Sequence, residues 1–296
     1  MFIHRIPKRF YSRINWKLQE SCGVPQYDTG CTYCQADIPS DLPIDYETSL
    51  TRTSAVPTKH VMILSQTPVN KLPSKIELIP GSIPNEIIKY KKLYQTNTQR
   101  VLISNIFLNN QKSVLDNYGV SGGKQLVMLY PDMKIIKFQM NHLDQFVQKY
   151  LFSKQEPVYN PFAPAATDDS KDSDDIIVED ENFEEFSIDK DMILTCGHKA
   201  RDLRCGIISP LLLNEIDSVL KKKNMEDDVY VGEISHIGGH AYAGNLLYYP
   251  KDCESDRDFI WYGRVFPDKI QGIIDDTVID KSIIKNLFRG DVDRYL

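Results

Sequence analysis

Residues 229–249 have the sequence VYVGEISHIGGHAYAGNLLYY, and this stretch decides how the rest of the chain can fold. Its first seven and last five residues are rich in β-branched and aromatic side chains, which predicts two strands. Gly238 and Gly239 lie between these strands, and a glycine inside a helix costs about 1 kcal/mol relative to alanine. We therefore place His236 and His240 on a loop that follows a strand, and not on one face of a helix.

Working outward from this stretch, the same order of elements is predicted in both halves of the chain. Each half runs strand, helix, strand, strand, strand, helix, and the ISNI of 103–106 occupies the place of the ISHI of 234–237. This order is typical of a thioredoxin-like domain, so the expected fold class is α/β with two tandem thioredoxin-like domains. The predicted strands are 60–65, 101–107, 125–130, 134–140, 192–195, 229–235, 245–249 and 259–265. The predicted helices are 84–94, 141–151, 211–220, 267–274 and 281–288.

An acidic segment separates the two halves. Residues 168–191 contain twelve Asp or Glu and two Lys, and several prolines precede them. Like charges repel one another and prolines stiffen the chain, so we expect 155–188 to be a disordered linker. The expected domains are therefore an N-terminal thioredoxin-like domain, 20–154, and a C-terminal thioredoxin-like ferredoxin domain, 189–296.

The first 19 residues have the composition of a mitochondrial presequence. They contain five Arg or Lys and no acidic residue, with apolar and aromatic side chains interleaved. They lack the continuous apolar core of a secretory signal. We expect residues 1–19 to be a transit peptide that is cut after Tyr11, and the protein to be mitochondrial, in the matrix rather than the intermembrane space.

The overall composition excludes several classes of protein. Hydrophobic residues make up 42% of the chain and charged residues 26%, which excludes wholesale disorder and a fibrous repeat. No stretch reaches the roughly 18 apolar residues of a membrane span, so none is expected. The formal charge of −6 does not favour binding to nucleic acid, and six cysteines are too few for a disulfide scaffold.

Four residues of the second half form the main candidate site. Eight residues separate Cys196 from Cys205, and three separate His236 from His240. Two thiolates and two imidazoles suit either zinc or an iron–sulfur cluster. Structural zinc sites usually space their cysteines two to four residues apart, so this wider loop favours a bulkier ligand than one ion. Zinc remains the alternative cofactor, and a buried thiol pair with unrelated histidines is the plain structural interpretation.

The second half also contains four motifs that can be compared with known families: CGHKARDLRCG at 196–206, HIGGHAYAGN at 236–245, WYGRV at 261–265 and FRG at 288–290. Together they resemble the sucrase/ferredoxin-like family of thioredoxin-like ferredoxins, and a looser resemblance extends over the first half. The resemblance implies a mitochondrial protein with a [2Fe–2S] cluster held by Cys196, Cys205, His236 and His240. The sugar-enzyme part of the family name is not taken as an activity.

Three further side chains lie inside or beside the Cys-x8-Cys loop. We expect His198 to hydrogen-bond near the cluster rather than to ligate it, because four ligands are already present. Arg201 and Arg204 could stabilise the reduced cluster or contact an acidic redox partner. Two solvated loop cations are an equally good interpretation, since surface charges rarely have a specific role.

The N-terminal cysteines form a second group of candidate redox thiols: Cys22, Cys31 and Cys34. The Cys31-x-x-Cys34 pair could cycle between dithiol and disulfide, but it precedes the first predicted strand instead of following it. We rank a structural or regulatory thiol pair first, a redox-active disulfide second and a zinc site that includes His60 third.

The sequence thus favours a mitochondrial electron carrier or redox sensor, acting in electron transfer or redox quality control with redox protein partners. An electron carrier or redox regulator is favoured over a substrate-converting enzyme, because no nucleophilic triad or phosphate-binding loop is evident and no catalytic residue can be named. The alternatives are a thiol-disulfide oxidoreductase that acts on mitochondrial protein thiols and a zinc-stabilised binding module.

Overall fold

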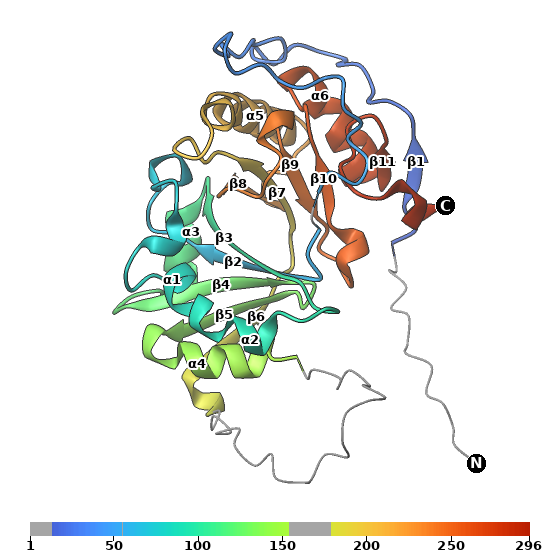
Figure 1. The fold of residues 1–296 in the computed structure, drawn as a ribbon. Coiled ribbons are helices and arrows are strands. Elements are labelled where there is room, and N and C mark those ends of the chain that lie inside the picture. Colours follow the sequence, from blue (N-terminus) through green and yellow to red (C-terminus); the bar gives the residue numbers. More distant parts are fainter. Residues whose placement is uncertain (1–13, 55, 154–178) are drawn as a thin grey trace, which may run out of the picture.

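The computed structural model describes residues 14–54, 56–153 and 179–296. The chain forms an α/β fold around one sheet of nine strands, in the order β10-β9-β7-β8-β3-β2-β4-β5-β6 (Figure 1). A separate small sheet pairs β1 with β11. The strands are β1 (Lys17–Gln19), β2 (Lys59–Leu64), β3 (Val101–Leu108), β4 (Lys124–Tyr130), β5 (Lys134–Gln139), β6 (Phe183–Ser187), β7 (Asp191–Cys196), β8 (Val229–Ile234), β9 (Leu246–Tyr249), β10 (Ile260–Tyr262) and β11 (Ser282–Ile284).

The two halves of the large sheet have the same strand order. In the first half β2 lies between the parallel β3 and the antiparallel β4, and β5 follows β4. In the second half β7 lies between the parallel β8 and the antiparallel β9, and β10 follows β9. The halves join where β3 pairs antiparallel with β8, with Ile106 opposite Ile234. This pairing covers the strand edge that each half would otherwise expose.

Two clusters of buried apolar side chains hold the helices against the sheet. One cluster packs α1, α2 and α4 on one face of the first half, where Ile87 and Phe146 are fully buried. The larger cluster begins on the opposite face of the first half, with Met128, and continues under α5 and α6 of the second half. The halves therefore share a core as well as a sheet. The helices are α1 (Ile83–Ile87), α2 (Lys91–Tyr94), α3 (Gln111–Asn117), α4 (Leu143–Phe146), α5 (Leu203–Lys222) and α6 (Pro267–Gly272).

Helix α5 is longer than the prediction of 211–220. It begins at Leu203, because the Asp202 carboxylate accepts a hydrogen bond from the Arg204 backbone N–H at 3.0 Å and caps the first turn. Pro210 lies inside the helix, where proline costs about 3 kcal/mol. Burial of aliphatic side chains such as Leu212 outweighs this cost, since each contributes about 1.5–3 kcal/mol.

The prediction of a helix over 281–288 is wrong. Residues Ser282–Ile284 form β11, which pairs parallel with β1. The partner strand lies more than 260 residues away in the sequence, at Lys17–Gln19, so no local pattern could reveal it. Strand β1 was not predicted either, nor was α3.

The predicted linker is wrong at its C-terminal end. Within 155–188, residues Phe183–Ser187 form β6, which pairs antiparallel with β5 and completes the edge of the sheet. Lysines of the first half compensate the acidic charge there, as in the Lys134 to Glu185 ion pair at 2.6 Å. Residues 154–178 of the predicted linker lie outside the described residues, as does the predicted cleavage site after Tyr11.

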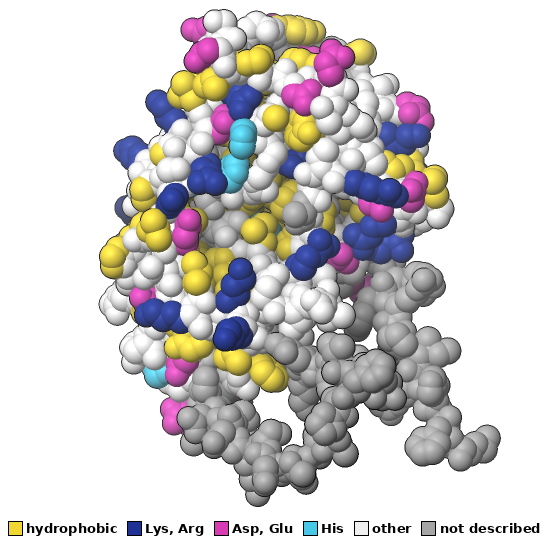
Figure 2. Space-filling view, in the orientation of Figure 1, with side chains coloured by type: hydrophobic (Ala, Val, Ile, Leu, Met, Phe, Trp, Pro, Cys, Tyr) yellow, Lys and Arg dark blue, Asp and Glu magenta, His cyan; other side chains and the backbone are white. Residues whose placement is uncertain are grey.

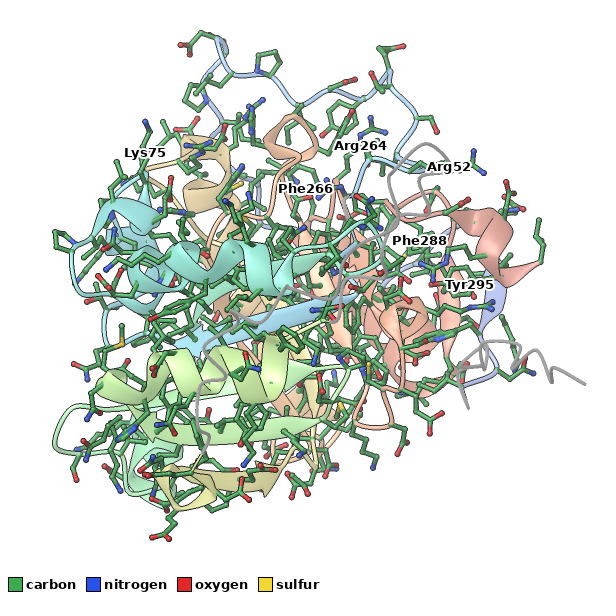
Figure 3. The ribbon with its side chains drawn as sticks, turned by 60° about the horizontal axis from the view of Figure 1, so that its bottom comes forward. Arg52, Lys75, Arg264, Phe266, Phe288 and Tyr295 are labelled. Atoms are coloured by element: carbon green, nitrogen blue, oxygen red, sulfur yellow. The ribbon has the colours of Figure 1, made fainter. Side chains whose placement is uncertain are left out.

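Residues 14–54, which we call the N-terminal arm, pack on the second half of the molecule. Trp16 donates to Asp258 at 2.9 Å, and Arg264 donates to the Asp45 carbonyl at 2.6 Å. Arg52 near the end of the arm pairs with Asp291 at 2.9 Å; Figure 3 shows the labelled Arg52 and Arg264 beside the arm. The N-terminal arm is therefore next to the first half in the sequence but packs against the second half in space. None of the helices in the described parts of the chain has the length and apolar character that a bilayer span needs.

Candidate metal centre

The structure brings the four predicted site residues together at the carboxyl ends of β7 and β8. Cys196 is the last residue of β7, and His236 follows two residues after β8. Cys205 lies in the first turn of α5, and His240 begins a short 3₁₀ turn. Because β7 and β8 are parallel, their carboxyl ends lie at the same edge of the sheet, which is where α/β proteins place their sites.

The thiols and imidazoles form two adjacent pairs. The Cys196 side chain contacts both Cys205 and His236, and the ring centroids of His236 and His240 are 5.6 Å apart. Both cysteines are buried, with 3% and 1% of their surface exposed, whereas His236 is half-buried and His240 is exposed. All six cysteines of the chain are free thiols. The thiol pair therefore lies inside the protein and the imidazole pair faces outward.

The electrostatics favour a thiolate in the pair of cysteines. The hydrogen bond from Cys205 lowers the pKa of Cys196 well below its usual value against the opposing effect of burial, and contact with His236 lowers it further. The same hydrogen bond and burial raise the pKa of Cys205. His236 has a buried Nδ1 atom that lacks a hydrogen-bond partner among the described residues. A buried polar atom without a partner is costly, so this nitrogen is available to a ligand.

A single metal ion would need several donors that converge on one point. Within 14–54, 56–153 and 179–296, no three His, Cys, Asp or Glu side chains are arranged in that way. The donors instead form the two neighbouring pairs just described, with Cys196 in contact with His236.

Arg289 is the functional residue that the sequence interpretation missed. It is 1% exposed, and in the described structure it donates only to uncharged oxygens: Asn245 Oδ1 at 2.6 Å, the Thr53 carbonyl at 3.0 Å, the Gly238 carbonyl at 3.3 Å and Thr53 Oγ1 at 3.3 Å. Burial lowers its pKa to about 10, against the opposing attraction of Cys196 and Cys205. A buried cation without a carboxylate is costly, and the thiolate form of Cys196, which its lowered pKa favours, is the nearby negative charge. The FRG motif at 288–290, which contains Arg289, was the one feature of the sequence that could have pointed to it.

Arg289 also explains one of the two glycines in the histidine loop. Gly239 has a φ of +74°, and a Cβ atom built there would lie 2.1 Å from a guanidinium nitrogen of Arg289. The Asn245 side chain donates to the Gly239 carbonyl at 3.0 Å. Thr53 of the N-terminal arm, Arg289 and Asn245 thereby fix the loop that carries both histidines.

The three side chains near the Cys-x8-Cys loop have different surroundings. His198 is 2% exposed, accepts from the His236 backbone N–H through Nδ1 at 3.2 Å and donates from Nε2 to the Pro73 carbonyl at 3.0 Å. It therefore supports the histidine loop by hydrogen bonding. Arg204 pairs with Asp202 at 3.0 Å and donates to the arm. Arg201 is exposed and makes no side-chain hydrogen bond or ion pair with another described residue.

The N-terminal cysteines lie on the N-terminal arm, whereas His60 lies in β2 of the large sheet. Cys31 and Cys34 form a turn in which the Cys34 N–H donates to the Cys31 carbonyl at 2.9 Å, and a hydrogen bond that the Cys34 thiol donates to Cys31 raises the pKa of Cys34 to about 11. Burial raises the pKa of Cys22 to about 12. His60 is fully buried in the sheet, where Tyr249 and Ser104 occupy both ring nitrogens. The zinc site with His60 is therefore wrong.

Comparison with known proteins identifies the family. The model of the sucrase/ferredoxin-like family matches residues 50–290, most of the chain, and the protein belongs to that family.

Its relatives include altered inheritance of mitochondria protein 32 from Debaryomyces hansenii, which is 41% identical over 97% of this chain and 99% of its own. The proteins of that name from Meyerozyma guilliermondii and Clavispora lusitaniae are each 40% identical over 92% of this chain and 94% of their own. No solved structure matches the chain.

Proposed function

We propose that the protein is a mitochondrial [2Fe–2S] protein that transfers electrons or senses redox state, with Cys196, Cys205, His236 and His240 as cluster ligands. The observation that carries the proposal is the meeting of two buried free thiols with two imidazoles at one edge of the sheet. Membership of the sucrase/ferredoxin-like family supports a ferredoxin-like cofactor. The names of the relatives support a mitochondrial location, and we favour the matrix.

The fold is also part of this proposal. The order 2-1-3-4 of the first four strands in each half supports two tandem thioredoxin-like domains, which we assign to 20–154 and 189–296. In this assignment most of the N-terminal arm is part of the first domain in the sequence, although it packs against the second domain. The acidic stretch before β6 remains our proposed linker.

The donor set fits a two-iron cluster in its arrangement and its chemistry. In Rieske-type proteins two cysteines hold one iron and two histidines hold the other, so the donors need to form two neighbouring pairs rather than one convergent group. The thiol pair and the imidazole pair of this site are neighbours of that kind. The unpartnered Nδ1 atom of His236 and the lowered pKa of Cys196 both favour metal binding.

The surrounding residues suit one-electron chemistry, which a [2Fe–2S] cluster would supply when bound. Neutral imidazoles carry no negative charge, unlike thiolates. This ligand set therefore favours a higher reduction potential of the cluster than four cysteine ligands would. The guanidinium of Arg289 favours additional negative charge near Cys196 and Cys205. The ring of His240 is exposed, so this end of the site is open to solvent or to a partner. Lys and Arg side chains flank the hollowed middle of one face, which suits an acidic redox partner (Figure 2).

Anaerobic purification of the full chain tests the proposal. We expect a red-brown protein with iron and sulfide each near two per chain, following the stoichiometry of such clusters. A colourless protein that carries zinc would support the zinc-stabilised binding module instead. A protein that binds neither metal after reconstitution with iron and sulfide would contradict both.

A thiol-disulfide oxidoreductase is the second candidate function, because the side chains of Cys31 and Cys34 are in contact. The raised pKa of Cys34 makes its thiolate scarce at neutral pH, which slows exchange. Purification of Cys31→Ser and Cys34→Ser variants from mitochondria under acid-quenched conditions tests this function. A mixed disulfide that depends on the remaining thiol supports it, and free thiols in both variants contradict it.

A further inference from the structure

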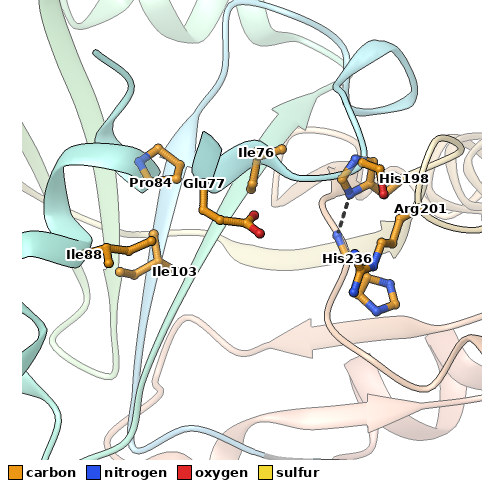
Figure 4. A pocket seen from close by; sticks show the side chains of 9 residues that line it. Ile76, Glu77, Pro84, Ile88, Ile103, His198, Arg201 and His236 are labelled. Atoms are coloured by element: carbon orange, nitrogen blue, oxygen red, sulfur yellow. Dashed lines mark hydrogen bonds between the residues drawn. The ribbon is translucent and has the colours of Figure 1, made fainter. Parts of the chain in front are cut away.

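A pocket beside the candidate metal centre lies between the two halves of the molecule. Its volume is about 210 Å³. Figure 4 shows that its two ends differ in character: Pro84, Ile88 and Ile103 of the first half lie at one end, and His198, Arg201 and His236 of the second half lie at the other. Polar groups form more of its lining than apolar ones, and convergent polar groups beside an apolar wall can orient a small-molecule ligand.

Two opposite charges at this pocket lack partners. Glu77 is half-buried and its carboxylate points toward the polar end, yet this carboxylate makes no hydrogen bond or ion pair with another described residue (Figure 4). The side chain of Arg201, which lines the same pocket, makes none either. The two groups therefore do not neutralise each other. The Glu77 carboxylate is partly withdrawn from water without a partner, so a ligand of opposite charge would stabilise it, and the exposed Arg201 guanidinium is free to pair with a second group of that ligand.

The two histidines of this end differ in what they can offer a ligand. Both nitrogens of His198 are occupied, by the Pro73 carbonyl and by the His236 backbone N–H. The unpartnered Nδ1 atom of His236 can add a hydrogen bond, and Arg201 and Glu77 supply the two opposite charges that recognise a ligand at this end.

We propose that this pocket binds a zwitterion of amino-acid size, whose carboxylate pairs with Arg201 and whose ammonium group pairs with Glu77. Its apolar side chain packs against Pro84, Ile88 and Ile103. The volume is below the roughly 300–1,000 Å³ of sites for drug-sized ligands, which limits the ligand to about the size of one amino acid. This site does not depend on the proposed cluster, although His236 belongs to both.

Calorimetric titration of the full-length protein with three matched probes tests the proposal. L-leucine carries both charges, 4-methylpentanoate lacks only the ammonium group, and 3-methylbutylamine lacks only the carboxylate. We expect L-leucine to bind about tenfold or more tightly than either analogue, since hydrogen bonds to charged groups are the strong ones.

Two substitutions and one control assign the charges. Arg201→Gln should remove the preference for leucine over 3-methylbutylamine, and Glu77→Gln should remove its preference over 4-methylpentanoate. Lys199→Gln, at an exposed position of the same loop that does not line the pocket, should leave all three affinities unchanged. No binding of leucine up to its solubility limit would overturn the proposal, and so would leucine binding that neither substitution weakens.

Discussion

The two halves of the sheet have the same strand order, but different side chains occupy the carboxyl ends of their parallel strands. In the first half, Gln111 follows β3 and is 5% exposed. Its side chain donates to the Ser65 carbonyl at 2.7 Å and accepts from the Leu108 N–H at 2.9 Å, so the ends of β2 and β3 are tied to each other. In the second half, the ends of β7 and β8 present Cys196 and His236.

The difference shows that the same strand order can have a purely structural role in one half and carry a candidate ligand site in the other. In the first half, Gln111 pairs with the backbone at the ends of β2 and β3, so those groups are not free to bind a ligand. The edge of the second half keeps free thiols and an unpartnered imidazole nitrogen next to a buried arginine. Function therefore has to be argued from the residues of the site, since the strand order alone does not distinguish the halves.

Removing a thiol from the edge of the second half should have the largest effect. We expect Cys196→Ser to lose most of its iron and sulfide, because the pair of thiolates is the anionic part of the donor set. Iron and sulfide content after anaerobic purification measures this. Cys253→Ser, which changes another buried free thiol, is the matched control and should keep its iron. Equal iron content in the two variants would contradict the ligand assignment.

Removing the buried cation beside the same edge should have the next largest effect. Arg289→Gln leaves Asn245, Gly238 and Thr53 without their donor, which we expect to lower the free energy of unfolding by about 2–4 kcal/mol. Urea unfolding measures the loss. Arg52→Gln removes ion pairs of a side chain that is 62% exposed and should cost about 0–1 kcal/mol. Similar losses in both variants would show that Arg289 has no special role.

The corresponding change in the first half should affect stability but not metal content. Gln111→Ala leaves the Leu108 N–H and the Ser65 carbonyl unpaired, and we expect a loss of about 1–3 kcal/mol. The exposed neighbouring change Lys112→Ala should cost little. Iron content should match that of the unmodified protein in both variants. A loss of iron in Gln111→Ala alone would mean that the two edges are not independent.

The smallest effect concerns the junction of the halves, where His60 of β2 bonds to Tyr249 of β9. Burial lowers the pKa of His60 from 6.5 to about 3, so below pH 6.5 the unfolded chain gains a proton that the folded chain does not. Stability should therefore fall as the pH decreases from about 6.5, by at most about 1.4 kcal/mol per pH unit.

Urea unfolding of the His60→Gln variant between pH 7.5 and 5 checks this contribution. The variant is expected to be less stable at pH 7.5 and to show a weaker dependence on pH than the unmodified protein. The half-buried His142 gives the control, His142→Gln, which should retain the full dependence. The same pH dependence in His60→Gln and in the unmodified protein would contradict the assignment.

The sequence predicted the central strands well because their signals are local. The buried apolar runs that became β2, β4 and β8 are short and bounded by turn residues, which suffices to define a strand. It did not predict the pairing of β1 with β11 or of β3 with β8, because each joins segments far apart in the chain. The start of α5 was missed because it depends on the Asp202 cap, and because Pro210, eight residues later, is a residue that usually interrupts a helix.

The candidate site was predicted only in part, because some of its residues stand in local motifs and others depend on contacts between distant segments. Cys196, Cys205, His236 and His240 stand in motifs whose residue types carry the chemistry, so spacing and resemblance were enough to name them. Arg289 lies in the FRG motif but was missed, because its role depends on burial and on contacts with Thr53 and Asn245 that the motif alone does not show. The pocket between the halves was missed because its lining comes from both of them.

Electron paramagnetic resonance of the dithionite-reduced protein tests the central proposal most directly. The proposal predicts a signal from one unpaired electron on a reduced [2Fe–2S] cluster, with g values that shift in both His236→Cys and His240→Cys because a thiolate replaces an imidazole. The absence of any signal after reconstitution with iron and sulfide would contradict the cluster. A signal that neither substitution changes would contradict the histidine ligands.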